Sequence, residues 1–261
     1  MTTESVTANI YYQKENVLQR YNQPYFLLNG EEFLFSSLFP HGLSGMRILD
    51  LGCGGGRIAY FLARQGAEVI ALDLSFPLLQ IARARQNLLP LVQGDAAQLC
   101  FAPQTFDMVI CAYNGLDYVF PKSQRVAALH SIFSILKPGG YFVFSSHNFG
   151  GISFGLVRFI FKPRSLVKAF LFALGHLVRG NLLQADCYIP DLIDGLLTYY
   201  AWPKTVLSDC REAGFHLKVI CPNPRMLATI QKLSATDFLT RLIDPWPYYV
   251  CIRPDDLSQS T

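Results

Sequence analysis

The stretch ILDLGCGGGR, residues 48–57, joins an apolar run to a cluster of glycines. The apolar residues 46–51 predict a buried strand, and residues 57–65 predict a helix that Gly66 ends. Glycines let the backbone turn tightly and approach a ligand with no Cβ in the way, and the N-terminus of the following helix favours a negative group. The stretch therefore predicts a ligand-binding loop, although a plain strand-to-helix turn with no ligand would show the same short motif.

Outward from this loop, short apolar runs alternate with amphipathic segments. Further elements are predicted as strands at residues 67–73, 89–95, 106–113 and 141–147 and as helices at 76–87 and 123–136. Strands joined by helices in this rhythm form a parallel sheet with helices on both faces. The pattern resumes after a long insertion, with a helix at 204–213, a strand at 215–220 and a last strand at 246–254. The predicted fold class is therefore α/β, with a doubly wound, mostly parallel sheet.

The insertion, residues 148–202, breaks this rhythm because it is long, very apolar and basic at its start. We expect a helical lid over the carboxyl edge of the sheet, whose aromatic and aliphatic side chains could line a substrate pocket. An ordinary helical cap with its own core, or a basic membrane-surface helix around 158–168, are the alternatives. A second apolar segment, 226–243, is also expected to be helical. The whole chain, 1–261, is expected to form a single domain.

The composition narrows the class of protein. Hydrophobic residues make up 51% and charged residues 16%, which is typical of a chain that buries a sizeable core. The net charge of +3 is too small to indicate nucleic acid as a partner. The seven cysteines have no CxxC spacing, so we expect no metal site and a reducing, cytoplasmic location. Residues 1–23 do not resemble a signal peptide, and charged residues and a proline interrupt the apolar run at 150–178.

Two aspartates follow the next predicted strands. Asp73 ends the second strand, 19 residues after Gly54, where its carboxylate can accept both ribose hydroxyls of a nucleoside. Asp95 ends the third strand and can meet the exocyclic amine of an adenine, although either aspartate could instead cap a helix. Arg57 stands where a dinucleotide fingerprint needs its last glycine, and Asp50 would repel a pyrophosphate. The expected ligand is therefore a nucleoside that carries an amino acid.

Five segments resemble the class I S-adenosylmethionine-dependent methyltransferases: ILDLGCGGGR (48–57), VIALDLS (69–75), LVQGDAAQL (91–99), FDMVICAYNGLDYV (106–119) and LKPGGYFVFSS (136–146). The resemblance implies S-adenosyl-L-methionine as the cofactor and a seven-stranded sheet whose final strand, 247–253, is antiparallel. It implies that the cofactor is bound by Asp50, Gly52, Cys53, Gly54, Gly56, Asp73, Leu74, Asp95, Ala96 and Tyr113. In many relatives an aromatic residue ahead of the first strand covers the cofactor, and Tyr21 or Tyr12 is the candidate here.

Methyl transfer from a sulfonium is an in-line displacement, so the protein mainly aligns the reacting atoms and excludes water. A base is needed only where the acceptor keeps a proton. His147, at the end of the fifth predicted strand, is the candidate base or a cation that orients an anionic acceptor; a loop histidine that caps local backbone is the alternative. Tyr113, expected near the sulfonium, is the second candidate catalytic residue. Asn114, Asp117 and Asn148 are expected, together with His147, to contact the acceptor.

The expected reaction is methyl transfer to a small molecule. An oxygen of a lipophilic or aromatic metabolite, as carboxylate or hydroxyl, is favoured over nitrogen or carbon. An NAD(P)-dependent oxidoreductase would explain the first glycines and Asp73, but not Asp95, Arg57 or the region of Tyr113. A non-catalytic cofactor-binding subunit is the other alternative, although every cofactor position holds a suitable residue. The oligomeric state is left open.

Overall fold

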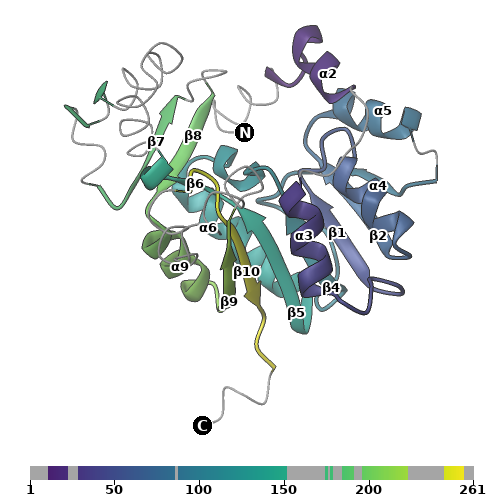
Figure 1. Cartoon of the computed structure of the whole chain (residues 1–261). Coiled ribbons are helices and arrows are strands. Elements are labelled where there is room, and N and C mark those ends of the chain that lie inside the picture. The colour runs from purple at the N-terminus through teal and green to yellow at the C-terminus, as the bar shows by residue number, and fades with distance from the viewer. Residues whose placement is uncertain are drawn as a thin grey trace.

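The computed structural model of the chain describes residues 11–22, 29–85, 88–151, 174–175, 177–178, 184–190, 196–222 and 244–255. The helix expected at 226–243 and the larger part of the insertion lie outside these residues. Figure 1 shows one central sheet between helices, with a smaller sheet beside its upper edge.

Seven strands form the central sheet, in the order β3-β2-β1-β4-β5-β10-β9. Their bounds are Arg47–Leu51 (β1), Glu68–Asp73 (β2), Leu91–Gln93 (β3), Phe106–Cys111 (β4), Leu136–Ser145 (β5), His216–Cys221 (β9) and Tyr248–Ile252 (β10). β1 to β5 run parallel, whereas β10 is antiparallel to both β5 and β9. The predicted doubly wound sheet with an antiparallel final strand is confirmed. The strand order reverses between β1 and β4, and open α/β sheets bind ligands at such a switch point, outside the carboxyl ends of the strands.

Helices cover both faces of this sheet. Their bounds are Glu15–Tyr21 (α2), Asn29–Leu38 (α3), Arg57–Arg64 (α4), Phe76–Arg85 (α5), Lys122–Ile135 (α6) and Pro203–Glu212 (α9). One core packs α3, α4 and α5 against strand residues such as Ile48, and the other packs α6 and α9 against neighbours such as Leu49. Successive strand residues point to opposite faces, so the continuous apolar runs of the strands supply both cores. No helix within the described ranges combines the length and the apolar character that crossing a membrane requires.

A second sheet of three short strands has the order β6-β8-β7. Its strands are β6 (His147–Asn148), β7 (Asp186–Pro190) and β8 (Leu197–Ala201). They correct the expectation that residues 148–202 are helical throughout. Strands this short show no measurable period inside an apolar segment, and their tyrosines and β-branched residues favour a pleated, half-buried surface.

Two boundaries in the central sheet also differ from the prediction. β5 begins at Leu136 rather than at residue 141, because the segment expected to stop the preceding helix pairs with the chain after β10. There Gly139 N–H donates to the Arg253 carbonyl at 2.8 Å, and Arg253 N–H donates to the Gly140 carbonyl at 2.9 Å. β3 is shorter than predicted because it lies at the free edge of the sheet and pairs only with β2.

Candidate functional site

The glycine loop after β1 is held in shape by the end of β2. Gly52, Gly54 and Gly56 have φ angles of 72°, 54° and 81°, a left-handed region that favours glycine. The backbone N–H of Gly54 donates to Asp73 Oδ2 at 2.7 Å, and the N–H of Ser75 donates to Oδ1 of the same carboxylate at 2.8 Å. Burial raises the pKa of Asp73 above its usual value. Asp73 therefore fastens the loop to the neighbouring strand end and presents a buried acceptor there.

Asp50, next to the last residue of β1, is almost fully buried. Its Oδ2 accepts the backbone N–H of Ala59, in the first turn of α4, at 2.9 Å. Burial raises the pKa of Asp50 to about 7, against the opposing effects of this hydrogen bond and of the Arg57 charge. A carboxyl group with such a pKa ionises readily when a further cation is bound near it.

Arg57, which departs from the dinucleotide fingerprint, begins α4 and pairs with a buried acid on α3. Both terminal nitrogens of its guanidinium donate to the Glu31 carboxylate, with the bond from Nη2 to Oε1 at 2.8 Å. The hydroxyl of Tyr248, in β10, donates to the same Oε1 at 3.0 Å. Two helices and a strand are thereby tied together at the start of α4, directly after the glycine loop.

α2 places an aromatic ring against the glycine loop. A Cβ added to Gly54 would meet the ring of Tyr21 at 3.0 Å, so a side chain at that position would require the ring to move. Burial raises the pKa of Tyr21 to about 12. The ring centroid of Tyr12 lies 6.0 Å from that of Tyr21 and 6.2 Å from that of Tyr118. Both covering candidates therefore lie at this edge of the sheet, and Tyr21 is the one in contact with the loop.

The residues after β3 form a small turn. Asp95 Oδ1 accepts the N–H of Ala97 at 2.9 Å, and the Asp95 carbonyl accepts the N–H of Gln98 at 3.0 Å. Ala96 packs against the hydrophobic core on the α6 side of the sheet. Leu74, at the end of the neighbouring strand, accepts a bond from a glutamine side chain of β3 on its carbonyl at 3.3 Å. The local turn engages one carboxylate oxygen of Asp95, so capping the turn and binding a ligand are compatible roles.

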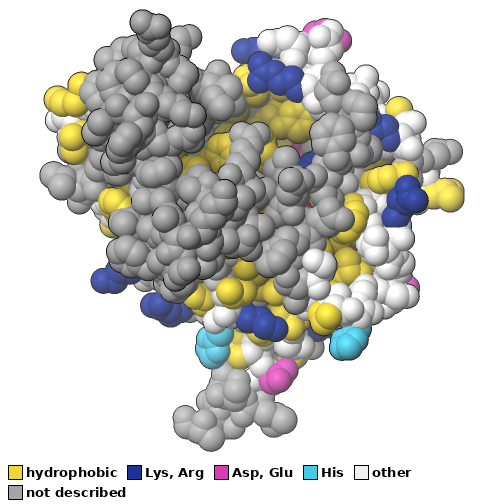
Figure 2. Space-filling view, in the orientation of Figure 1, with side chains coloured by type: hydrophobic (Ala, Val, Ile, Leu, Met, Phe, Trp, Pro, Cys, Tyr) yellow, Lys and Arg dark blue, Asp and Glu magenta, His cyan; other side chains and the backbone are white. Residues whose placement is uncertain are grey.

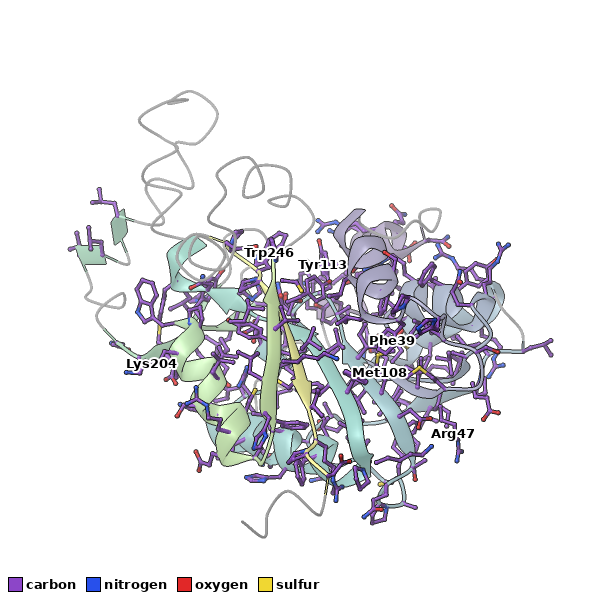
Figure 3. The ribbon with its side chains drawn as sticks, turned by 60° about the horizontal axis from the view of Figure 1, so that its bottom comes forward. Phe39, Arg47, Met108, Tyr113, Lys204 and Trp246 are labelled. Atoms are coloured by element: carbon purple, nitrogen blue, oxygen red, sulfur yellow. The ribbon has the colours of Figure 1, made fainter. Side chains whose placement is uncertain are left out.

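The chain leaves β4 through two residues in the left-handed region, Tyr113 and Asn114, with φ angles of 57° and 61°. Non-glycine residues with this geometry are uncommon, and such strain gathers at functional sites. The ring of Tyr113 is 49% exposed and lies 6.1 Å from that of Trp246, which precedes β10. Figure 3 shows both side chains at one end of the sheet, opposite Arg47 at the start of β1. The two rings therefore mark the carboxyl edge of the parallel strands.

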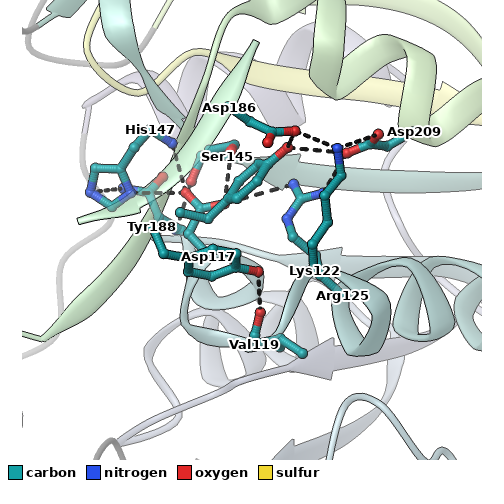
Figure 4. A network of polar contacts seen from close by, with 12 residues as sticks. Asp117, Val119, Lys122, Arg125, Ser145, His147, Asp186, Tyr188 and Asp209 are labelled. Atoms are coloured by element: carbon teal, nitrogen blue, oxygen red, sulfur yellow. Dashed lines mark hydrogen bonds and ion pairs between the residues drawn. The ribbon is translucent and has the colours of Figure 1, made fainter. Parts of the chain in front are cut away.

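Asp117 and His147 form a buried pair beyond the ends of β4 and β5 (Figure 4). Asp117 lies in a short 3₁₀ helix, Gly115–Tyr118, and the two side chains are almost without exposed surface. Asp117 Oδ2 accepts the backbone N–H of His147 at 2.7 Å and lies 2.8 Å from its Nδ1, while Ser146 Oγ donates to Oδ1 at 2.8 Å. Because an ionised carboxylate can only accept, the neutral ring carries its proton on Nδ1 and presents Nε2 as an acceptor.

Asn114 faces the other nitrogen of this ring. Its Nδ2 lies 3.3 Å from His147 Nε2, and its backbone N–H donates to Ser145 Oγ at 2.9 Å. Asn114 Oδ1 is buried and has no hydrogen-bond partner among the described residues. An unpaired buried polar atom costs about 1–3 kcal/mol. A ligand that brings a hydrogen-bond donor to this oxygen would therefore stabilise the site.

Asn148, also expected at the acceptor, is fastened to the backbone. Its Nδ2 donates to the Asp244 carbonyl at 2.9 Å, and its Oδ1 accepts the N–H of Gly150 at 2.9 Å. Its backbone N–H donates to the Pro245 carbonyl at 2.9 Å. The predicted residues Tyr113, Asn114, Asp117 and His147 are thus gathered together, whereas Asn148 joins β6 to the segment ahead of β10.

Three residues beside the site were not predicted: Glu31, Arg125 and Trp246. Trp246 had a usable signal, because the residue ahead of an antiparallel last strand lies at the carboxyl edge of its parallel neighbours. Glu31 had none, since its partner Arg57 lies 26 residues away, and neither had Arg125, since its burial also depends on Asp209, 84 residues away in the chain. Within the described part of the chain, no group of three His, Cys, Asp or Glu side chains could hold a metal ion.

A family model and curated sequence relatives match part of this chain. Residues 48–140 match the family model of a methyltransferase domain. A ubiquinone biosynthesis O-methyltransferase from Aliivibrio fischeri is 37% identical over 113 residues, which are 41% of this chain and 47% of that protein. The match therefore spans about half the length of such curated relatives.

Two solved structures share the fold. An S-adenosylmethionine-dependent methyltransferase from Mesorhizobium loti has a TM-score of 0.56 at 20% identity, covering 85% of this chain and 97% of that one. The CcbJ methyltransferase from Streptomyces caelestis has a TM-score of 0.62 at 18% identity, covering 94% of this chain and 98% of that one. At such identities the likeness concerns the fold.

The sheet order defines a doubly wound α/β domain, with the glycine loop and the buried acid that ends β2 at its switch point. Residues 48–140 match a methyltransferase domain, and the fold is shared with S-adenosylmethionine-dependent methyltransferases, whose cofactor is S-adenosyl-L-methionine. The family match ends before His147, so it bears on the cofactor side of the site and not on the acceptor side.

Proposed function

We propose that this chain transfers a methyl group from S-adenosyl-L-methionine to a hydroxyl oxygen of an aromatic or lipophilic small molecule. The observation that carries the proposal is the buried Asp117–His147 pair at the carboxyl edge of the sheet, beside Tyr113 and Asn114. A transfer to a carboxylate would need no base, whereas a hydroxyl must lose its proton.

The residues around the glycine loop are complementary to this cofactor. A buried Asp50 suits the ammonium of the methionine moiety, and Asp73 suits the two ribose hydroxyls. Asp95 suits the adenine amine, Tyr21 covers the loop, and Tyr113 would lie near the sulfonium. Backbone and small side chains complete the proposed cofactor set: Gly52, Cys53, Gly54, Gly56, Leu74 and Ala96. The support is the loop geometry itself, in which Asp73 fixes Gly54 and no Cβ stands between the loop and Tyr21.

The cofactor supplies a methyl group that is already activated on a sulfonium. The chain therefore has to align the acceptor, exclude water and remove one proton. In the proposed reaction the hydroxyl oxygen gains the methyl group and His147 Nε2 gains the proton. Asp117, 2.8 Å from Nδ1, holds the ring and faces the resulting imidazolium. To reach Nε2, the hydroxyl replaces Asn114 Nδ2, whose 3.3 Å separation is longer than the hydrogen bonds of 2.7–2.8 Å that Asp117 accepts. Such a base contributes about 10²–10⁴-fold to the rate.

The charge of Asp117 favours a hydroxyl over a carboxylate acceptor. Its carboxylate lies directly behind the His147 ring, and its negative charge repels an anionic acceptor. The cation nearest Asp117, Arg125, is fully buried and is shared with Asp209.

Two aromatic rings lie beside the ring of His147. The ring centroid of His147 lies 4.8 Å from that of Tyr200 and 6.2 Å from that of Trp246. The Trp246 ring in turn contacts the ring of Tyr113. Figure 2 shows apolar side chains at the upper centre of the molecule, where the carboxyl edge of the sheet lies in Figure 1. An aromatic or lipophilic acceptor fits such surroundings. The relative from Aliivibrio fischeri is named as an O-methyltransferase of ubiquinone biosynthesis, which agrees with this choice.

The experiment compares acceptors that differ in one group. Alkyl phenols and the matching alkyl benzoic acids are incubated with the protein and S-adenosylmethionine, and S-adenosylhomocysteine release is measured. The proposal expects turnover with phenols, none with benzoates, and loss of turnover in His147→Ala. His130→Ala, an exposed histidine of α6, is the matched control and should keep full activity. Methylation of the benzoates alone, or full activity in His147→Ala, would contradict the proposed acceptor and base.

A further inference from the structure

A fully buried arginine stands behind the Asp117–His147 pair. Arg125, on α6, has Nη2 at 3.7 Å from Asp117 Oδ1 and Nη1 at 3.4 Å from Asp209 Oδ2. Its guanidinium carbon lies 4.3 Å from the ring centroid of Tyr199, in β8. Figure 4 shows the arginine between the two aspartates, on the side of Asp117 away from His147.

The guanidinium of Arg125 acts on Asp117 through its charge and does not form a bidentate hydrogen bond with the carboxylate. Nε and Nη2 of Arg125 have no hydrogen-bond partner among the described residues, and its side chain has no exposed surface. Burying a cation with incomplete hydrogen bonding is costly, and a structural arginine usually satisfies a carboxylate with two parallel bonds. Asp117, which is also fully buried, has its oxygens engaged by Ser146 and His147 instead. The contribution of Arg125 at Asp117 is therefore mainly positive charge.

The same cation connects the pair to the second sheet. Lys122, one helical turn before Arg125, contacts Asp186 of β7 and lies 3.6 Å from Asp209 Oδ1. The hydroxyl of Tyr199 donates to Asp186 at 2.9 Å and lies 3.2 Å from Asp209 Oδ2. Three carboxylates thus face two permanent cations. The remaining negative charge would be balanced by the positive charge of a doubly protonated His147. The ring takes this form when it has removed the acceptor's proton.

We propose that Arg125 is a positioning residue: its charge keeps Asp117 ionised, and ionised Asp117 keeps the neutral His147 protonated on Nδ1 with Nε2 directed to the acceptor. This inference rests on the proposed function, because it gives the arginine a part in the removal of the acceptor's proton. Neutral substitution should release that constraint, and a lysine should restore it in part, since a lysine keeps the charge on a shorter side chain.

The test compares variants that do not leave an unpaired buried carboxylate. Removing Arg125 alone would leave the buried Asp209 with one cation fewer, so the substitutions are made in the Asp209→Asn background. Three proteins are compared: Asp209→Asn, Asp209→Asn with Arg125→Met, and Asp209→Asn with Arg125→Lys. The His147 tautomer is measured by nitrogen-15 NMR of the imidazole at mildly alkaline pH, with His147→Gln identifying its signals. Turnover of the best phenol and affinity for S-adenosylmethionine are measured beside it.

The expected result separates the three proteins. Asp209→Asn keeps the Nδ1–H tautomer and most of its turnover. Adding Arg125→Met shifts His147 towards the Nε2–H tautomer and lowers kcat at least about tenfold, part of the 10²–10⁴-fold that a general base supplies, with cofactor affinity unchanged. Arg125→Lys recovers the tautomer. An unchanged tautomer and kcat with Arg125→Met would overturn the inference, as would equal losses in Asp209→Asn alone. The NMR measurement needs no acceptor, so failure of the proposed function is recognised separately as absent turnover in the unsubstituted protein.

Discussion

Binding of the cofactor should release protons from Asp50. Burial raises the pKa of Asp50 to about 7, so at pH 7 about half of the molecules carry this carboxyl group protonated. In the proposed site the cofactor's ammonium lies near this group, and a neighbouring cation lowers a carboxyl pKa. Each binding event is therefore expected to release most of a proton at pH 6 and about half a proton at pH 7.

The sign of the pH dependence follows from the same linkage. Below pH 7 the carboxyl group must lose its proton for the ammonium to bind well, so affinity falls by up to about tenfold per pH unit as the pH is lowered. Above that pH Asp50 no longer contributes to the pH dependence, because it is already ionised. A carboxyl group that stayed ionised throughout this range would give a flat profile.

Calorimetric titration with S-adenosylmethionine in two buffers of different ionisation enthalpy measures the released protons directly. Asp50→Asn is the matched variant, because its amide oxygen can still accept the Ala59 N–H and its side chain cannot titrate. It should bind more weakly and release no protons. A binding enthalpy that is the same in both buffers at pH 6 and at pH 7 would refute the reasoning, and so would equal proton release from Asp50→Asn.

The other predictions concern single side chains. Asp73→Ala should raise the Kd for S-adenosylmethionine by about 10²–10⁴-fold, since two bonds to a charged acceptor are each worth about 1.5–3 kcal/mol; unchanged affinity by calorimetry would remove Asp73 from the ribose site. His147→Ala should lower kcat by about 10²–10⁴-fold with little change in cofactor affinity, whereas His130→Ala should change neither. Gly54→Ala should weaken cofactor binding without unfolding the protein, because its Cβ would stand 3.0 Å from the Tyr21 ring; normal affinity would show that the loop tolerates a side chain.

The cofactor side of the site was predictable because its signals are local. The apolar runs, the glycines after residue 51 and an aspartate at the end of the next strand all lie within one βαβ unit. Parallel strands bring their carboxyl ends to one edge, so a side chain placed at a strand end is also placed in space. The sequence did not decide whether Tyr21 or Tyr12 covers the cofactor, because no motif fixes the position of the segment ahead of β1.

On the acceptor side, the sequence predicted which residues lie at the edge of the sheet. It did not predict which of them contact one another. Asp117 and His147 were both expected at the edge, but the hydrogen bond between them depends on how the turns after β4 and β5 are built. Arg125 lies in α6, and a helical arginine is normally exposed. Its burial results from carboxylates on the turn after β4 and on α9. β7 and β8 were missed for a similar reason, since each strand is defined by its partner across the sheet.

Calorimetric titration of the purified protein with S-adenosylmethionine, S-adenosylhomocysteine and NAD⁺ tests the central claim most directly. The account predicts that the first two ligands bind and that NAD⁺ does not, because Arg57 is committed to Glu31 and the loop presents Asp50 and Asp73 rather than a site for a pyrophosphate. Binding of NAD⁺ without binding of either S-adenosyl compound would contradict the account and return the glycine loop to a dinucleotide site.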